Sequence, residues 1–157
     1  MKIHCLTGKS IEISGDKLDN VSLDNLDLHR AMLEGINLSK SSFVKSNLRG
    51  AFLYKADLKS CNLESANLII ADFRETNLEG ANLKNTLSIS TLFEKANLEN
   101  SDFEDAIIEG ASFNESDLRG ANMKAIGIEK ATFEKAKYDK NTVWPIGFNP
   151  DFAVFCE

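Results

Sequence analysis

The amino-acid sequence predicts an all-β solenoid, in which the chain winds into stacked coils around one apolar interior. From residue 18 to residue 138, every fifth residue is Leu, Phe, Ile, Met or Tyr at 24 of 25 positions, and the exception is Ser88. Two residues before each of these positions, a second column between residues 31 and 136 holds only Ala, Ser, Thr or Cys, apart from Ile36 and Ile126. No insertion or deletion interrupts the spacing, so we expect one repeated structural unit.

The spacing of the two columns determines the kind of unit. A large and a small residue two positions apart point to the same face of an extended strand. A period of five is odd, however, so a straight strand would send successive large residues to opposite faces, and an α-helix would rotate each by about 140° from the last. All of them face one interior only if the chain bends by the same angle in every repeat. Such a chain forms coils that stack about 4.8 Å apart, with backbone hydrogen bonds between them.

The repeats resemble those of a known family. The stretch ADLKSCNLESANLIIADF at residues 56–73 and the stretch ANLKN at residues 81–85 follow the pattern A-(D/N)-L-x-x of the pentapeptide-repeat family, and the resemblance covers about residues 16–140. It implies a right-handed quadrilateral parallel β-helix with four repeats in each coil. About six coils would then form a rod about 30 Å long at strand spacing.

Both ends of the repeats are predicted to be capped, because an open coil end exposes core and unpaired backbone groups. In residues 1–15, IHCL and IEI flank TGKS and are typical of two short strands joined by a turn. In residues 141–157, Asn149 and Pro150 resemble the N-cap and first residue of a short helix. Four aromatic residues there are expected to supply apolar cover, either as a lid or as a dimer interface: Trp144, Phe148, Phe152 and Phe155. The caps and the repeats together form one domain.

Composition limits the classes of partner. The net charge of -6 and the isoelectric point near 5.0 disfavour direct binding to nucleic acid phosphates or anionic membranes. No apolar stretch approaches the roughly 20 residues of a transmembrane helix, and the first residues are polar where a secretory signal would be apolar. We therefore expect a cytoplasmic protein with no cofactor, whose partner is a protein.

The sequence offers no catalytic or metal-binding constellation. Cys5, Cys61 and Cys156 are few, odd in number and far apart, which indicates reduced thiols rather than disulfides or a metal site. Neither His4 nor His29 has a neighbouring motif residue that would make it a metal ligand or a general base. Motifs for nucleophilic, phosphate-binding and zinc-dependent chemistry are absent as well. We therefore predict a non-enzymatic protein.

Short polar residues precede the large residue of each repeat and could be mistaken for catalytic or calcium-binding acids. Five of them recur at 20-residue spacing: Asn37, Asp57, Asn77, Asn97 and Asp117. This regularity indicates a structural role, in which the side chains stack along one edge and form hydrogen bonds with the backbone at the turns.

One segment is strongly acidic, and we refer to its acids as the acidic belt. Between residues 94 and 117, eight acids accompany a single base, Lys95: Glu94, Glu99, Asp102, Glu104, Asp105, Glu109, Glu115 and Asp117. Some members of the pentapeptide-repeat family are thought to imitate DNA and bind DNA gyrase, so the resemblance suggests a topoisomerase modulator as an alternative function. With 20 residues in each coil, however, one column alternates in sign, which favours pairing between coils: Glu64, Lys84, Glu104 and Lys124.

A cluster of aliphatic residues surrounds the break at Ser88. The repeat pattern turns six of them outward in consecutive coils: Ile69, Ile70, Leu87, Ile89, Leu92 and Ile107. Such a cluster, on a surface of Lys, Glu, Asn and Gly, is typical of a contact site. A second interpretation is compatible with the first. The strand would roll at Ser88, so that Leu87 or Ile89 turns inward and fills a hole that otherwise costs about 2 to 5 kcal/mol.

These observations lead to one functional expectation. A strong repeat signal, the lack of a catalytic constellation and the outward aliphatic cluster predict a non-enzymatic interaction module. Its flat faces would bind a protein partner or a second copy of the chain, which would form a homodimer.

Overall fold

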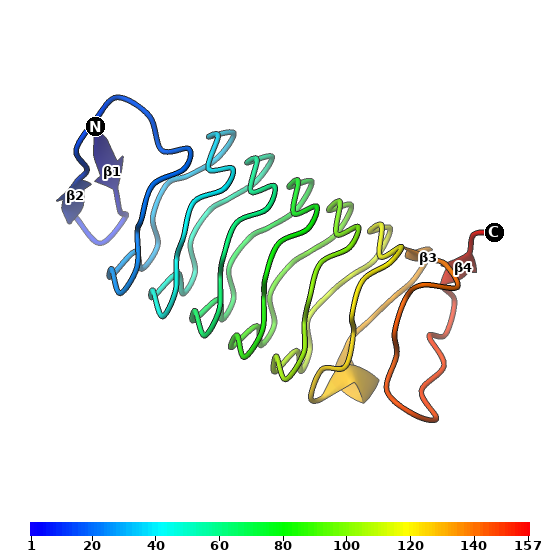
Figure 1. Ribbon diagram of the computed structural model, residues 1–157. Helices are drawn as coiled ribbons and strands as arrows, with labels where there is room; N and C mark the ends of the chain where they lie inside the picture. Colours follow the sequence, from blue (N-terminus) through cyan, green and yellow to red (C-terminus); the bar gives the residue numbers. More distant parts are fainter.

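The computed structural model describes residues 1–157 as coils stacked along one axis, with the termini at opposite ends (Figure 1). Parallel β-bridges join each coil to the next, and from Ser22–Ser42 to Asp102–Asn122 every bridge spans 20 residues. Bridges recur every five residues, so each coil has four sides. The chain therefore forms an all-β solenoid, as predicted. Its handedness stays a prediction.

Regular secondary structure is confined to the two ends. Strand β1 (Lys2–His4) pairs in antiparallel with β2 (Ser10–Glu12), and β3 (Lys137–Tyr138) pairs in parallel with β4 (Val154–Phe155). The only helix, η1 (Ile128–Lys130), is one 3-10 turn, so no helix of the structure could span a membrane. Each side of a coil contributes a single bridge, because a five-residue repeat leaves too few extended residues for a longer strand.

The corners of the coils place one residue in the left-handed backbone region, where glycine and asparagine are favoured. Gly80, for example, has a φ of 65° and Asn85 a φ of 58°. The predicted structural role of the recurring polar residues is confirmed at these corners. Each of the five accepts, through Oδ1, the backbone N–H two residues further on, at 3.0–3.3 Å: Asn37, Asp57, Asn77, Asn97 and Asp117.

The interior contains the two predicted columns. From residue 18 to residue 118, every fifth residue is buried, and so are the small residues at most positions of the second column. Phenylalanine rings stack along one side of the interior. The centroid of the Phe93 ring lies 5.4 Å from that of Phe73 and 5.0 Å from that of Phe113, and the Phe113 and Phe133 centroids lie 5.2 Å apart. Each such pair adds about 0.5–1.5 kcal/mol to the energy of burial.

Ser88 points into this interior and is fully buried. Its Oγ lies 3.0 Å from Oγ1 of Thr86, which also donates to the carbonyl of Leu83 at 2.9 Å. Leu87 stays outward with 38% of its surface exposed, and Ile89 is only half-buried. The prediction that the strand rolls and turns one of them inward is therefore wrong. The hydrogen bond to Thr86 satisfies the hydroxyl, and the larger phenylalanines on the adjoining side can supply the missing volume.

The regular pairing shifts by one residue near the last coil. Ile107 pairs with Ile126, which lies 19 residues further on. A tight turn, in which the amide of Ala125 donates to the carbonyl of Met123 at 2.7 Å, brings Ile126 forward by one position. Ile126 is 53% exposed, and Ala125 is buried instead. The assignment of Ile126 to the inward small column is therefore wrong, although the spacing in the sequence is unbroken.

The N-terminal hairpin of β1 and β2 is bonded to the first coil. The amide of Met32 donates to the carbonyl of His4 at 2.8 Å, and the amide of Leu6 donates to the carbonyl of Arg30 at 3.0 Å. Ile3 is buried between the hairpin and the coil interior. The backbone hydrogen bonding of the solenoid therefore continues into the hairpin.

The C-terminal segment differs from the prediction. The expected short helix at Asn149 and Pro150 is absent, because Phe152 has a φ of 60° and the chain then extends into β4. Trp144 and Phe148 pack against the core residue Phe133, at ring-centroid distances of 5.4 and 5.8 Å. Phe152 is 84% exposed and Phe155 is 54% exposed. The prediction of a lid is therefore wrong for Phe152, whereas the ring of Phe155 packs on Tyr138, the last large residue of the repeats, with 5.4 Å between the centroids. The chain around both follows the edge of the last coil through the β3–β4 pair.

Two aspartates make the stability of the fold depend on pH. Hydrogen bonds from Arg74 to both carboxylate oxygens, at 2.8 and 2.6 Å, lower the pKa of Asp72. Hydrogen bonds from the backbone N–H of Gly120, the hydroxyl of Thr142 and the backbone N–H of Asn141 lower the pKa of Asp139. Because the folded-state pKa values are depressed, this stabilisation is complete above the unfolded pKa of about 3.9 and is lost as the pH falls further.

We therefore expect the melting temperature to fall as the pH drops from about 4 to about 2. Thermal unfolding followed by circular dichroism measures it. In the variant Asp139→Asn the acid-induced fall should be smaller, because one of the titrating groups is gone. A native melting temperature that does not change between pH 4 and pH 2 would contradict this account.

Candidate protein-interaction surface

Six outward aliphatic residues lie on neighbouring coils, and we refer to them as the apolar strip: Ile69, Ile70, Leu87, Ile89, Leu92 and Ile107. Leu87 forms a β-bridge with Ile107, and the amide of Ile70 donates to the carbonyl of Ile89 at 3.0 Å. Leu92 lies on the adjoining side, where it forms bridges with Asp72 and Ser112. The structure therefore places all six predicted residues close together on consecutive coils.

The exposure of the strip is uneven. Ile70 exposes 53% of its surface and Leu87 38%, whereas the other four residues are half-buried among their neighbours. Ile126, which is 53% exposed, continues the column of Leu87 and Ile107 by one more coil. The sequence pattern assigns this isoleucine to the interior, and nothing in the spacing indicates the one-residue shift that brings it outward.

Ile70 has an unfavourable backbone conformation as well as an exposed side chain. Its φ of 54° lies in the left-handed region, where a β-branched residue is a rare outlier. The equivalent corners of the coils before and after hold Gly50 and Ser90. A left-handed conformation costs a non-glycine residue about 1–2 kcal/mol, so this isoleucine lowers the stability of the isolated chain. Strained residues of this kind gather at functional sites.

Family models agree with the repeat architecture. The model of pentapeptide repeat regions matches residues 56–133, and the model of eight-copy pentapeptide repeats matches residues 22–59. The chain belongs to the pentapeptide-repeat family. No curated protein matches the sequence.

Several solved pentapeptide repeat proteins are similar to this one. A protein from the thylakoid lumen of Arabidopsis thaliana is 20% identical, with 65% of this chain and 68% of that chain aligned and a TM-score of 0.43. The plasmid-mediated fluoroquinolone resistance protein QnrB1 is 16% identical, with 87% and 91% aligned and a TM-score of 0.43. A protein from Nostoc PCC 7120 is 27% identical, with 76% and 84% aligned and a TM-score of 0.37. Similarities at this level carry no argument about the role of this pentapeptide-repeat chain.

Four neighbouring bases, Lys84, Lys95, Arg119 and Lys130, pair with acids of the belt in this pentapeptide-repeat protein and compensate half of its eight negative charges. Lys84 pairs with Glu104 at 2.8 Å and with Asp102 at 3.1 Å, which confirms one pair of the predicted column of alternating charge, whereas Glu64 and Lys124 form no ion pair with their neighbours in it. Arg119 pairs with Glu99 and Asp117, and further ion pairs join Glu109 to Lys130 and Glu115 to Lys95. Glu94 and Asp105 have no basic partner, and Lys84 and Arg119 are each shared by two acids, so the belt stays acidic but is interrupted by bases.

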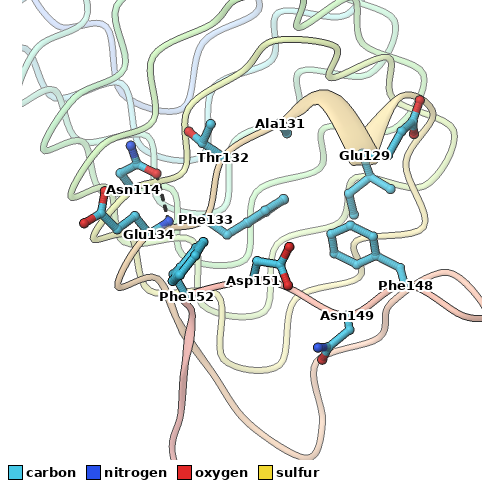
Figure 2. A pocket seen from close by; sticks show the side chains of 11 residues that line it. Asn114, Glu129, Ala131, Thr132, Phe133, Glu134, Phe148, Asn149, Asp151 and Phe152 are labelled. Atoms are coloured by element: carbon cyan, nitrogen blue, oxygen red, sulfur yellow. Dashed lines mark hydrogen bonds between the residues drawn. The ribbon is translucent and has the colours of Figure 1, made fainter.

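A pocket with an apolar lining lies at the C-terminal end of the pentapeptide repeats, where the C-terminal segment meets the last coil. It has a volume of about 320 Å³, with Phe133 and Phe148 among its apolar lining residues and Glu129, Glu134 and Asp151 among its acids (Figure 2). In the hydrogen bond drawn there, the backbone N–H of Glu134 donates to Oδ1 of Asn114 at 2.9 Å. None of the lining hydroxyl or carboxylate groups is hydrogen-bonded to another lining side chain, so the pocket contains no paired base and nucleophile.

The histidines and cysteines stay apart in the pentapeptide-repeat structure. His4 contacts Ser10, with 3.0 Å between Nδ1 and Oγ, and His29 lies half-buried on an outer side. Cys5 and Cys61 are buried, and burial raises the pKa of both thiols, which keeps them protonated at neutral pH. No group of three or more His, Cys, Asp or Glu side chains is arranged to hold a metal ion.

Proposed function

We propose that this pentapeptide-repeat protein is a non-enzymatic interaction module that binds a protein through the apolar strip. The observation that supports the proposal most directly is Ile70, which combines an exposed aliphatic side chain with a left-handed backbone. The left-handed φ is common to the corners of the coils, so the unusual feature is an exposed β-branched aliphatic side chain at such a corner, which a partner would cover. The backbone of the strip is rigid at Leu87 and Ile107, because each of these residues forms a β-bridge with the coil before it and another with the coil after it.

A rigid side of this kind needs little ordering when it binds. Each coil is bonded to the next by backbone hydrogen bonds of 2.7–3.1 Å, so the strip residues are already held in one arrangement. A preformed surface loses less conformational entropy on binding than a flexible one. The strip therefore fits a docking role better than a catalytic one.

Affinity capture from the native cell extract tests the proposal. The native chain and a variant carrying Ile89→Lys and Ile107→Lys are immobilised, and the retained proteins are compared. We expect a protein that the native chain retains and the variant loses, because two charges would then be buried in the contact. A matched control, Ser60→Lys with Asn100→Lys, adds the same charge at exposed corners away from the strip and should retain it. Equal retention by all three chains would refute the proposal.

A second variant separates binding from folding. Ile70→Asn replaces the strained residue by one that the chain already uses at left-handed corners such as Asn85 and Asn100. We expect its free energy of unfolding to be unchanged or higher by up to about 1 kcal/mol, while the captured protein is lost. Urea unfolding measures the first quantity. A variant that loses stability and still binds would show that Ile70 serves the fold and not the contact.

The alternative function, a DNA mimic that binds DNA gyrase, is supported less well by the geometry. Six of the eight acids in the belt are already paired with Lys or Arg, whereas a DNA mimic needs unpaired acids in a continuous array. A gyrase supercoiling assay at micromolar concentrations of the protein separates the two functions, since only the mimic would change the rate of supercoiling.

A further inference from the structure

The side of the rod that carries most of the apolar strip has opposite charges at its two ends. Backbone hydrogen bonds fix the order of the coils on this side. In each, the amide of one residue donates to the carbonyl of a residue in the next coil: Arg30 to Arg49, Gly50 to Ile69, Ile70 to Ile89 and Ser90 to Glu109. Arg30 and Arg49 therefore precede the aliphatic residues, and neither forms an ion pair in the structure. Glu109 follows them and is already paired to Lys130 at 3.0 Å, and Glu129 lies beyond it in η1, after the one-residue shift of the last coil. Asp27 also lies at the end near the N-terminus, in the column of Leu87, and is paired to Lys9 at 3.1 Å. That end therefore carries the unpaired charge of the two arginines, and the opposite end carries that of Glu129.

We propose that this side binds a second copy of the chain, with the two rods antiparallel and related by a two-fold axis. This inference rests on the proposed function and names its partner. A two-fold contact uses the same patch on both copies, so the patch must be complementary to itself when reversed. An order of basic, apolar and acidic coils satisfies this condition. A parallel pair would instead place the arginines of the two copies against each other.

The spacing of the coils gives the register. An axis that crosses the rod midway between the coils of Ile69 and Ile89 brings each of these isoleucines opposite the other in the second copy. Arg49, one coil before Ile69, then lies opposite Glu109, which is one coil after Ile89. The next pair outward consists of the coils of Arg30 and Glu129. Each attraction between a basic and an acidic residue occurs twice in the dimer, because the two-fold axis generates a second, identical pair.

The size of the side limits the affinity. A side about 10 Å wide and about 30 Å long buries roughly 600 Å² in total when it stacks on a second copy, against about 1,200–2,000 Å² in stable complexes. The dimer is therefore weak, with a dissociation constant of about 10–500 μM. It forms at high local concentration, and salt weakens it, because its charged groups lie at the edge of the contact.

Two charge variants test the arrangement by sedimentation equilibrium. The acidic variant carries Arg30→Glu and Arg49→Glu, and the basic variant carries Glu109→Lys and Glu129→Lys. We expect each alone to associate at least about tenfold more weakly than the native chain, because each reversal acts at two places in the dimer. An equimolar mixture of the two should recover association of native strength or better. The matched control, Lys40→Glu with Lys45→Glu, changes the charge on other sides and should associate like the native chain.

The outcomes separate this inference from the proposed function. A native chain that stays monomeric up to about 500 μM overturns the dimer, and so does a mixture that associates no better than its components. Equal association of all the chains points to another surface and also overturns it. If the dimer fails while Ile89→Lys with Ile107→Lys still abolishes capture of a different protein, the proposed function stands. Circular dichroism confirms that each variant is folded. Glu129→Lys alone tests the acidic end without breaking an ion pair of the native structure, whereas Glu109→Lys removes the pair with Lys130.

Discussion

Phe93→Ala is expected to lower the free energy of unfolding by about 3–5 kcal/mol, the largest effect among the substitutions considered for this protein. Phe93 is fully buried and its ring contacts three others, at centroid distances of 5.4 Å to Phe73, 5.6 Å to Phe103 and 5.0 Å to Phe113. Truncation leaves a cavity in the middle of the rod and removes all three ring contacts. Urea unfolding followed by circular dichroism measures the loss.

A matched control isolates the contribution of the ring stack. Phe43 is also fully buried, but it lies in an earlier coil and takes part in none of the ring pairs of the stack. Phe43→Ala therefore creates a similar cavity without breaking the stack, and we expect it to cost about 1–2 kcal/mol less than Phe93→Ala. Equal losses would show that cavity formation alone accounts for the effect.

The period of five was sufficient to predict the solenoid, because its physical basis is local and repeated. Every repeat needs one large inward residue, one small one and a corner, and residues such as Asp57 and Asn77 hold the corner through their own side chains. The same regularity correctly placed Leu87 beside Ile107 and Ile69 in the column of Ile89. Pattern and structure agree wherever each repeat can be treated alone.

The pattern failed where neighbouring repeats influence each other. Ile126 moves outward because a tight turn at Ala125 shortens one side by a residue, and no gap in the sequence marks that turn. The C-terminal segment has no repeat to guide it, so the capping signal at Asn149 was outweighed by strand pairing between β4 and β3. Charge pairing across coils likewise interrupts the acidic belt with bases such as Lys84 and Arg119, which is visible only once the columns are stacked.

Opposite charges at the two ends of one side also depend on stacking. Arg49 and Glu109 lie 60 residues apart in the sequence and belong to no common motif, yet they lie in one column three coils apart. A flat side held by backbone bonds displays such a gradient without distortion, because the coils cannot shift against one another. This combination of rigidity and self-complementary charge favours a second copy over an unrelated basic or acidic protein, which would match only one end.

Ser88→Leu is expected to destabilise the protein by about 1–3 kcal/mol, although it restores the residue type that the period of five calls for. Ser88 is fully buried and hydrogen-bonded to Thr86, and the adjoining side already carries Phe73, Phe93 and Phe113. A leucine would overfill this interior and remove one hydrogen-bond partner of the buried threonine hydroxyl, which still donates to the carbonyl of Leu83.

The control for this substitution is Ser88→Ala, which removes the hydroxyl without adding volume. We expect it to cost about 0.5–1.5 kcal/mol, the net contribution of one hydrogen bond, and so less than Ser88→Leu. Urea unfolding of the two variants separates overpacking from the loss of the hydrogen bond. A leucine variant that is more stable than the native chain would show that space remains beside Ser88. The exposure of Leu87 and Ile89 would then follow from an imperfect core, and the argument that the apolar strip exists for a partner would be weakened.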